Sequence, residues 1–215
     1  MIKSSFAIYG ASGFGREVFC YLRENQARIN QSWDFIGFFD DGTPINTGYL
    51  KYGSILGGIE ILNNWSEELN VIIAISNPEI RSFIYSKIIN DKIKFPNLIN
   101  SDVIIFDKDI NHFGKGNIIF SKCNFSVDTY VGDFNIFNGS ISVGHDSMIG
   151  SYNSFMPGSK VSGMVKIGNG NQFGMNSTMI QGISIGNKNV IAPNTFLTKS
   201  IGDQGTYYSA ILKKL

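Results

Sequence analysis

The chain has 215 residues, with 18 Lys and Arg against 17 Asp and Glu, which gives a net charge of +1. This balance argues against a nucleic acid or an anionic membrane surface as the partner, and no window of the sequence reaches the length of a membrane span. Charged residues make up only 16% and glycine occurs 24 times, a composition typical of a β-rich protein with many turns and buried assembly surfaces.

The N-terminal apolar stretch is too short for a secretory signal peptide. The two cysteines, Cys20 and Cys123, have no metal-binding or redox spacing, and we expect both to be small, reduced core residues. We therefore expect a cytoplasmic protein.

Residues 1–100 alternate strand and helix patterns, which predicts a small Rossmann-like parallel sheet with helices on its faces. The expected strands are residues 6–10, 33–41, 71–76 and 94–100, and the expected helices are residues 14–26 and 77–90. Asn77 is a suitable helix cap and Pro78 suits the first turn. The stretch from Asp41 to Gly58 is rich in Gly, Thr and Asn and is expected to form a loop.

Residues 101–215 follow a different pattern, an internal repeat of six residues. Every sixth residue from Phe113 to Leu197 is large and apolar. Glycine recurs every eighteen residues, at 114, 132, 150, 168 and 186, and asparagine does so at 117, 135, 153, 171 and 189. Three hexads therefore form one coil of a triangular hexapeptide β-helix with an apolar axis. We expect the asparagines to form a structural ladder, and the C-terminal tail to pack on the last coils.

A glycine-rich loop, "YGASGFG" at residues 9–15, joins the first strand to the first helix. Gly10, Gly13 and Gly15 give the spacing G-x-x-G-x-G, not that of dinucleotide sites. Such a loop lets the backbone approach a ligand and directs helix N-terminal amides at a phosphate. A tight strand–helix turn without a ligand is the alternative.

Two acidic residues, Asp40 and Asp41, follow the second strand. Carboxylates at this edge of a parallel sheet commonly accept hydrogen bonds from a ribose or a base, although a solvated turn would have the same composition. Together with the glycine loop, they favour a nucleotide or a nucleotide-linked small molecule over a redox cofactor.

The only histidine within the regular coils, His145, lies in "SVGHDSMIG" at residues 142–150. His145 and Asp146 are the third and fourth residues of their hexad, counted from the apolar anchor Val143, so both belong to an outward corner. A His–Asp contact there requires the corner to bend, because adjacent residues on a straight strand point to opposite faces. Gly163 lies one coil further on in the same column, where it would leave room for an acyl group. His112 precedes the regular coils and is expected to be a surface residue.

The order of these parts resembles bacterial sugar acyltransferases, typified by the acetyltransferase that modifies UDP-4-amino sugars for protein glycosylation. Sialic-acid O-acetyltransferases and GDP-perosamine N-acetyltransferases share the architecture. The resemblance covers essentially the whole chain, in "IYGASGFG", "FFDD", "AISNPEIRSFIYSKI", "FPNLIN", the hexapeptide run and "VGHDSMIG". It implies a left-handed β-helix, a homotrimer with active sites between subunits, and acetyl-CoA as co-substrate without a metal.

The resemblance also implies site residues. His145 would be the general base and Asp146 its acidic partner. The positions that match acetyl-CoA contacts are Asn138, Ser154, Gly163, Met175 and Pro193. The positions that match contacts to the sugar nucleotide are Gly10, Ser12, Gly13, Phe14, Asp40, Asp41 and Gly57.

Three positions depart from the family pattern. Ser154 replaces a second histidine, Phe14 stands where relatives often have histidine, and "YYSAILKK" replaces a C-terminal G-x-P-A-K segment. These departures concern the acyl donor, the sugar nucleotide and the outer part of the coenzyme site respectively.

The sequence therefore predicts an acetyl-CoA-dependent N-acetyltransferase that acts on a nucleotide-linked amino sugar. Imidazole suits general-base work at neutral pH, and no serine or cysteine has a credible activating base, so direct transfer is expected. The alternatives are O-acetylation of sialic acid or another sugar hydroxyl, and a non-catalytic trimer that binds a nucleotide sugar.

Overall fold

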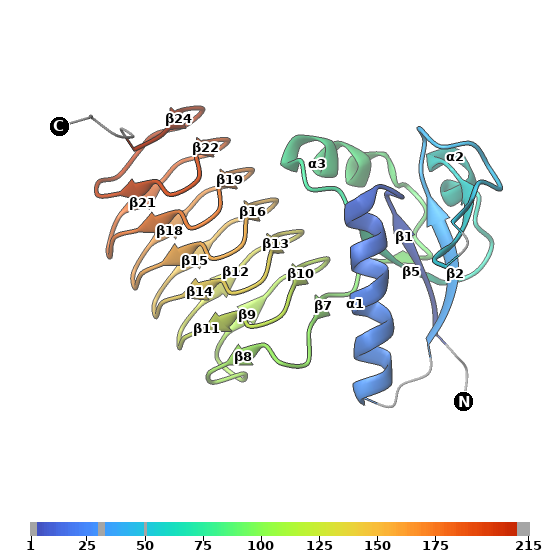
Figure 1. Cartoon of the computed structure of the whole chain (residues 1–215), viewed down its shortest axis with the longest axis horizontal. Coiled ribbons are helices and arrows are strands. Elements are labelled where there is room, and N and C mark those ends of the chain that lie inside the picture. The colour runs from blue at the N-terminus through green and yellow to red at the C-terminus, as the bar shows by residue number, and fades with distance from the viewer. Residues whose placement is uncertain (1–3, 30–32, 50, 210–215) are drawn as a thin grey trace. The chain divides into compact units, whose positions relative to one another are not determined.

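The computed structural model describes residues 4–29, 33–49 and 51–209 (Figure 1). The chain divides into two compact units, Met1–Ser101 and Asp102–Leu215. Within the described ranges, no helix combines the length and the apolarity that crossing a bilayer requires.

The N-terminal unit is built on a sheet with the strand order β3-β4-β2-β1-β5-β6. The central strand β1 (Ser4–Tyr9) pairs in parallel with β2 (Trp33–Phe39) and β5 (Leu69–Ile73). The remaining strands are β4 (Gly53–Gly57), which is parallel to β2, β6 (Ile93–Lys94), which is parallel to β5, and β3 (Gly48–Tyr49), which is antiparallel to β4. The predicted parallel sheet is confirmed.

Two expectations for this unit were wrong in detail. The stretch expected to be a loop contains β3 and β4, because Ile55 is a buried strand residue even though glycines surround it. The strand expected at residues 94–100 is interrupted at Pro96 and gives β6 and β7 (Leu98–Ile99) on either side.

The helices are α1 (Gly13–Ile29), α2 (Ile59–Asn63) and α3 (Pro78–Lys87). The start of α3 is as predicted, because the Asn77 side chain accepts hydrogen bonds from the amides of Glu79 and Ile80. The short helix α2 has no counterpart among the expected elements.

The C-terminal unit is a parallel β-helix whose two-residue strands form three faces (Figure 1). Face 1 contains β10 (Ile118–Ile119), β13 (Ile136–Phe137), β16 (Ser154–Phe155), β19 (Gln172–Phe173), β22 (Val190–Ile191) and β24 (Thr206–Tyr207). Face 2 contains β8 (Ile104–Ile105), β11 (Asn124–Phe125), β14 (Ser142–Val143), β17 (Lys160–Val161), β20 (Thr178–Met179) and β23 (Phe196–Leu197). Face 3 contains β9 (His112–Phe113), β12 (Tyr130–Val131), β15 (Met148–Ile149), β18 (Lys166–Ile167) and β21 (Ser184–Ile185).

The sixth-residue anchors fill the axis of this β-helix, and from Ile119 to Leu197 each is at most 6% exposed. Phe155 stacks between Phe137 and Phe173 at centroid distances of 4.8 and 4.6 Å. The asparagine ladder is also present. The Nδ2 of each inner asparagine donates to Oδ1 of its counterpart one coil earlier, at 3.2, 3.1, 2.9 and 3.1 Å for Asn135, Asn153, Asn171 and Asn189.

The corners of the β-helix share one backbone conformation. The fourth residue of each hexad from Gly116 to Asn194 has a positive φ between 53° and 78°, and none of these residues is β-branched. This left-handed residue turns the chain from one face to the next. The predicted fold class, a small Rossmann-like parallel sheet followed by a left-handed hexapeptide β-helix, is confirmed. At the C-terminal end, β24 pairs with β22, and the part of the expected tail at residues 210–215 lies outside the described residues.

Candidate active site

The corner between faces 2 and 3 carries His145, and we call residues 126–128, 144–146, 162–164 and 180–182 the histidine corner. The fourth-residue turn falls on Asp146, whose φ is 56°. This turn brings two side chains that would diverge on a straight strand together, and His145 Nδ1 lies 2.6 Å from Asp146 Oδ2. The bend that the pairing requires is therefore the general corner turn of the fold.

This contact fixes the roles of the two ring nitrogens. A carboxylate only accepts hydrogen bonds, so the proton of the pair resides on Nδ1 and the lone pair of neutral imidazole on Nε2. Both side chains are about half-exposed, at 49% for His145 and 56% for Asp146. Part of the imidazole is therefore open to solvent.

The imidazole packs directly against the backbone at Gly163, one coil further along. A Cβ at this position would lie 2.6 Å from His145 Nε2 and 2.8 Å from Cε1. The sequence interpretation assigned this space to an acyl group, whereas in the structure the ring of His145 occupies it. The absence of a side chain at Gly163 thus allows the His145 imidazole to take this orientation.

A second glycine, Gly144, keeps the same place clear from the opposite side. A Cβ there would lie 2.5 Å from Gly163 N, so it would cover that amide. Among the described residues, no hydrogen-bond partner is found for the amide of His145 or of Gly163. The sequence analysis missed Gly144, although the same column carries Ser126, Ser162 and Ile180 in other coils.

Ser147, behind the histidine, ties the two coils together. Its buried hydroxyl donates to the carbonyl of Ser162 (3.1 Å) and accepts from the amide of Val165 (3.4 Å). These bonds hold the coil of His145 in register with the coil of Gly163.

Four of the five expected acetyl-CoA residues lie on corners, and they are divided between two of them. Asn138, Met175 and Pro193 occupy the corner between faces 1 and 2, while Gly163 belongs to the histidine corner. Met175 is 52% exposed and its carbonyl accepts from the Asn194 amide (2.8 Å), so its own amide is the group a ligand could use. Pro193 can offer only a carbonyl.

Ser154 does not fit its expected role. It lies in β16 on face 1 and its side chain has no exposed surface, so a ligand cannot reach the hydroxyl in this structure. The expected coenzyme contact at Ser154 is not supported.

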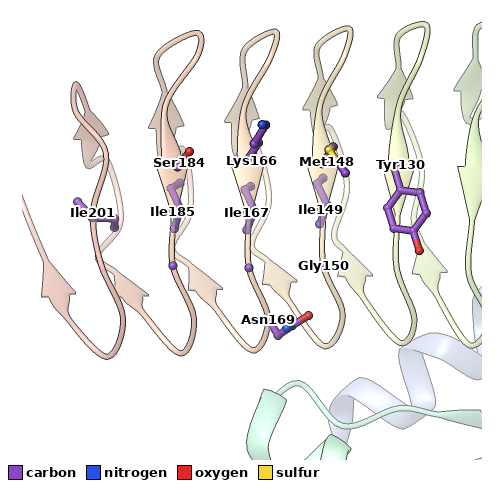
Figure 2. Close-up of a pocket in the computed structure, with 12 residues that line it drawn as sticks. Tyr130, Met148, Ile149, Gly150, Lys166, Ile167, Asn169, Ser184, Ile185 and Ile201 are labelled. Carbon is purple, nitrogen blue, oxygen red and sulfur yellow. The ribbon is translucent and has the colours of Figure 1, made fainter.

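A groove of about 500 Å³ runs along face 3 and onto the corner between faces 3 and 1, where Gly150, Gly168 and Gly186 line it (Figure 2). Figure 2 shows Tyr130, Met148, Lys166 and Ser184 in a row on successive coils. Tyr130 and Met148 are 45% and 50% exposed and are paired on neighbouring strands, so together they form an exposed apolar surface. The sequence analysis had not singled out this surface.

The glycine loop of the N-terminal unit requires its glycines for packing. Gly10 has a φ of +106°, and a Cβ there would lie 2.8 Å from Ala74 O. A Cβ at Gly15 would collide with Gly10 O. Ser12 and Gly13 are exposed and Phe14 is half-buried, so these three are the loop residues that a ligand could contact.

The two aspartates after β2 are both held by the backbone around them. The amides of Ala11 (2.8 Å) and Gly42 (2.9 Å) donate to Asp40, and the amide of Ile59 (2.8 Å) donates to Asp41. Gly57 has a φ of +151°, and a Cβ there would lie 2.7 Å from the Cβ of Ile61.

A cavity of about 560 Å³ opens beside these aspartates. Its walls are Asp40–Ile45 and Gly58–Ile61. Carboxylates and aliphatic side chains thus line one cavity at the carboxyl edge of the sheet. This combination suits a ligand with both a flat apolar ring and hydrogen-bond donors.

Cys123 does not support a route through a covalent acyl-thiol intermediate. Cys123 is buried, and burial raises the pKa of its thiol to about 11. The thiolate, which is the nucleophilic form, is therefore scarce near neutral pH.

Comparison with known proteins now adds to this geometry. Residues 5–88 match the family model described as the PglD N-terminal domain. No curated protein matches the chain in sequence.

Several solved structures are similar over nearly the whole chain. The acetyltransferase domain of PglB from Neisseria gonorrhoeae FA1090, in complex with acetyl coenzyme A, is 22% identical with a TM-score of 0.83, over 97% of each chain. WeeI from Acinetobacter baumannii AYE is 25% identical with a TM-score of 0.84, over 95% of this chain and 96% of that one. A mutant perosamine N-acetyltransferase from Caulobacter crescentus, in complex with CoA and GDP-perosamine, is 17% identical with a TM-score of 0.83, over 96% and 94%.

These matches confirm the resemblance that the sequence predicts. The order of a PglD-type N-terminal domain and a hexapeptide β-helix is shared with structures of sugar acetyltransferases. The similar structures named above contain acetyl-CoA in one case, and CoA with a nucleotide-linked amino sugar in another.

Proposed function

We propose that this protein is an acetyl-CoA-dependent N-acetyltransferase that acts on a nucleotide-linked amino sugar. The observation that carries the proposal is His145, whose Nδ1 contacts Asp146 and whose Nε2 faces the backbone of Gly163. The relatives in complex with acetyl-CoA, or with CoA and GDP-perosamine, support the choice of substrates.

In this mechanism, groups of the chain accept and return the amine proton and stabilise the negative charge that develops on the thioester oxygen. Nε2 of His145 takes the proton from the sugar's amine as its nitrogen adds to the thioester carbonyl. Asp146 holds the ring and stabilises the imidazolium. When the tetrahedral intermediate collapses, the C–S bond breaks, and the imidazolium returns the proton to the departing CoA thiolate.

The oxyanion of that intermediate requires a hydrogen-bond donor close to His145. The uncapped amide of Gly163 meets this requirement, because Gly144 leaves it uncovered and the imidazole lies beside it. A preorganised amide of this kind is typically worth ~10²–10³ in kcat.

We further propose a homotrimer in which each active site lies between two subunits. Within one chain, Asn138, Met175 and Pro193 lie on a different corner from His145, so these coenzyme positions would come from a neighbouring copy. The groove on face 3, where Tyr130 and Met148 are exposed, offers an apolar surface for contacts between subunits.

The acceptor's nucleotide would bind to the N-terminal unit. Ser12, Gly13 and Phe14 would contact the phosphates, and Asp40, Asp41 and Gly57 would border the base and ribose. The cavity beside the aspartates and the match to the PglD N-terminal domain support this assignment. We place the enzyme in the cytoplasm, in a route that supplies acetamido sugars for glycan biosynthesis.

The direct test is thiol release from acetyl-CoA in the presence of UDP-, dTDP- or GDP-linked amino sugars. We expect release with at least one of them, together with an acetamide product detected by mass spectrometry. Turnover only with hydroxyl-bearing sugars such as sialic acid would replace N- by O-acetylation. Nucleotide-sugar binding without any thiol release would indicate a non-catalytic binding protein instead.

A further inference from the structure

Tyr9 is a buried polar residue at the carboxyl edge of the N-terminal sheet that the proposed mechanism does not use. It ends the central strand β1, between β2 and β5, and is 2% exposed. Its phenol hydroxyl donates a hydrogen bond to Asp41 Oδ2, across 32 residues of sequence. The hydroxyl thus reaches a carboxylate in the wall of the cavity.

The other oxygen of Asp41 is held independently. The amide of Ile59, the first residue of α2, donates to Asp41 Oδ1 at 2.8 Å. Gly58 is essential to this contact, since a Cβ there would collide with Asp41 Oδ1. Tyr9 and Ile59 therefore fix the carboxylate at both ends.

The surroundings of Tyr9 keep its hydroxyl protonated. Burial raises the pKa of Tyr9 above its ordinary range, and the hydrogen bond and charge of Asp41 raise that pKa further. The phenol is therefore a constant donor at physiological pH. A carboxylate held by two donors keeps a single orientation and presents its remaining lone pairs to the cavity.

We infer that Tyr9 is a positioning residue for the nucleotide-linked substrate and that it acts through Asp41. The inference rests on the proposed function in one respect, namely that the cavity beside Asp41 binds the nucleotide. Tyr9 fixes the orientation of Asp41, which forms part of one cavity wall. The Asp41 carboxylate also accepts from the first amide of α2, and the start of α2 forms the opposite wall. The acetyl-transfer chemistry depends on residues of the other unit and should not require Tyr9.

The test is a double-mutant cycle of Tyr9→Phe and Asp41→Asn, read as KM for the nucleotide-linked sugar and as Kd for UDP, dTDP and GDP. Tyr9→Phe alone should raise both constants about tenfold, the size expected for a lost hydrogen bond to a charged group. kcat and KM for acetyl-CoA should change by less than about twofold. In the Asp41→Asn background, Tyr9→Phe should add almost nothing.

A matched control is Tyr85→Phe, which removes a hydroxyl from a half-buried tyrosine on α3 that does not line the cavity. It should leave all constants unchanged. If Tyr9→Phe fails to fold, Gly58→Ala tests the step through which Tyr9 acts, namely the orientation of Asp41. Its methyl group would displace Asp41 Oδ1 and should raise the same KM and Kd, and unchanged constants would overturn the inference.

The outcomes separate this inference from the proposed function. Nucleotide binding without acetyl transfer would overturn the proposed function and leave the cycle measurable through Kd. An unchanged Kd and KM in Tyr9→Phe, or a tenfold effect that persists in the Asp41→Asn background, would overturn the role of Tyr9. A wild type that binds none of the nucleotides or their sugars would overturn both.

Discussion

Two corners of the same β-helix use one backbone geometry for different purposes. At the corner between faces 3 and 1, which we call the ladder corner, side chains of the next coil accept hydrogen bonds from the outward amides. Lys115 N donates to Asp133 Oδ1 (2.9 Å), Asp133 N to Ser151 Oγ (2.9 Å), and Ser151 N to Asn169 Oδ1 (2.7 Å). The series continues through Asn187 to Asp203.

At the histidine corner, the equivalent positions are Val127, His145, Gly163 and Gln181, and no comparable ladder joins them among the described residues. The inner position also changes, from Ser147 to Val165 and Ile183, where the ladder corner keeps asparagine throughout. The fold thus tolerates a corner whose amides are uncapped. The candidate site thus arises where structural hydrogen bonds are absent and glycines also remove side chains.

Among changes that leave the base in place, Gly163→Ala should have the largest effect. The added methyl group cannot coexist with the imidazole in its observed position, so the ring must move. A displacement of about 1 Å can cost ~10² in rate, and we expect a fall of that order in kcat, measured by thiol release. Retained activity would show that the ring is not held at Gly163 during turnover.

Asp146→Asn should have a smaller effect. The amide cannot act as a carboxylate partner for the imidazolium, but the pair is about half-exposed and water weakens the interaction. We expect kcat to fall on the order of tenfold, with little change in thermal stability. An Asp146→Glu variant, which keeps the charge, should recover part of the lost rate, and no recovery would argue against the electrostatic role.

Asn171→Ala should have the reverse pattern, with a loss of stability and little loss of activity. The buried Asn171 side chain donates to Asn153 Oδ1 and Gly186 O and accepts from the Asn189 amide. Each buried group left unpaired costs about 1–3 kcal/mol, so the unfolding transition should shift to lower denaturant. The specific activity of the folded protein should stay within about twofold. A strong loss of activity without destabilisation would contradict the purely structural role of the ladder corner.

The repeat made the β-helix predictable, because every coil needs the same anchors, inner asparagines and corner glycines. The outward placement of His145 followed from the same register. The strands β3 and β4 were not foreseen, since their glycine-rich sequence resembles a loop and only pairing with β2 makes them strands.

Contacts between residues that are distant in the chain could not be predicted from the sequence. The bond between Tyr9 and Asp41 depends on two strand ends that meet in space, and the use of Gly163 by the imidazole depends on a side-chain rotamer. Ser154 was assigned from the resemblance alone. The repeat does not reveal its burial, because the position before the anchor on face 1 is buried at Ile118 and Ile136 but exposed at Val190.

If the histidine corner carries the acetyl transfer, the loss of its outward side chain must slow the reaction far more than the loss of one at the ladder corner. His145→Ala and Asn187→Ala remove one such side chain each, and Asn187 does not line the groove on face 3. With acetyl-CoA and the active nucleotide-linked amino sugar, we expect kcat to fall about 10²–10⁴-fold in His145→Ala and to stay nearly unchanged in Asn187→Ala. Thiol release at the wild-type rate in His145→Ala would show that the histidine corner does not carry the reaction.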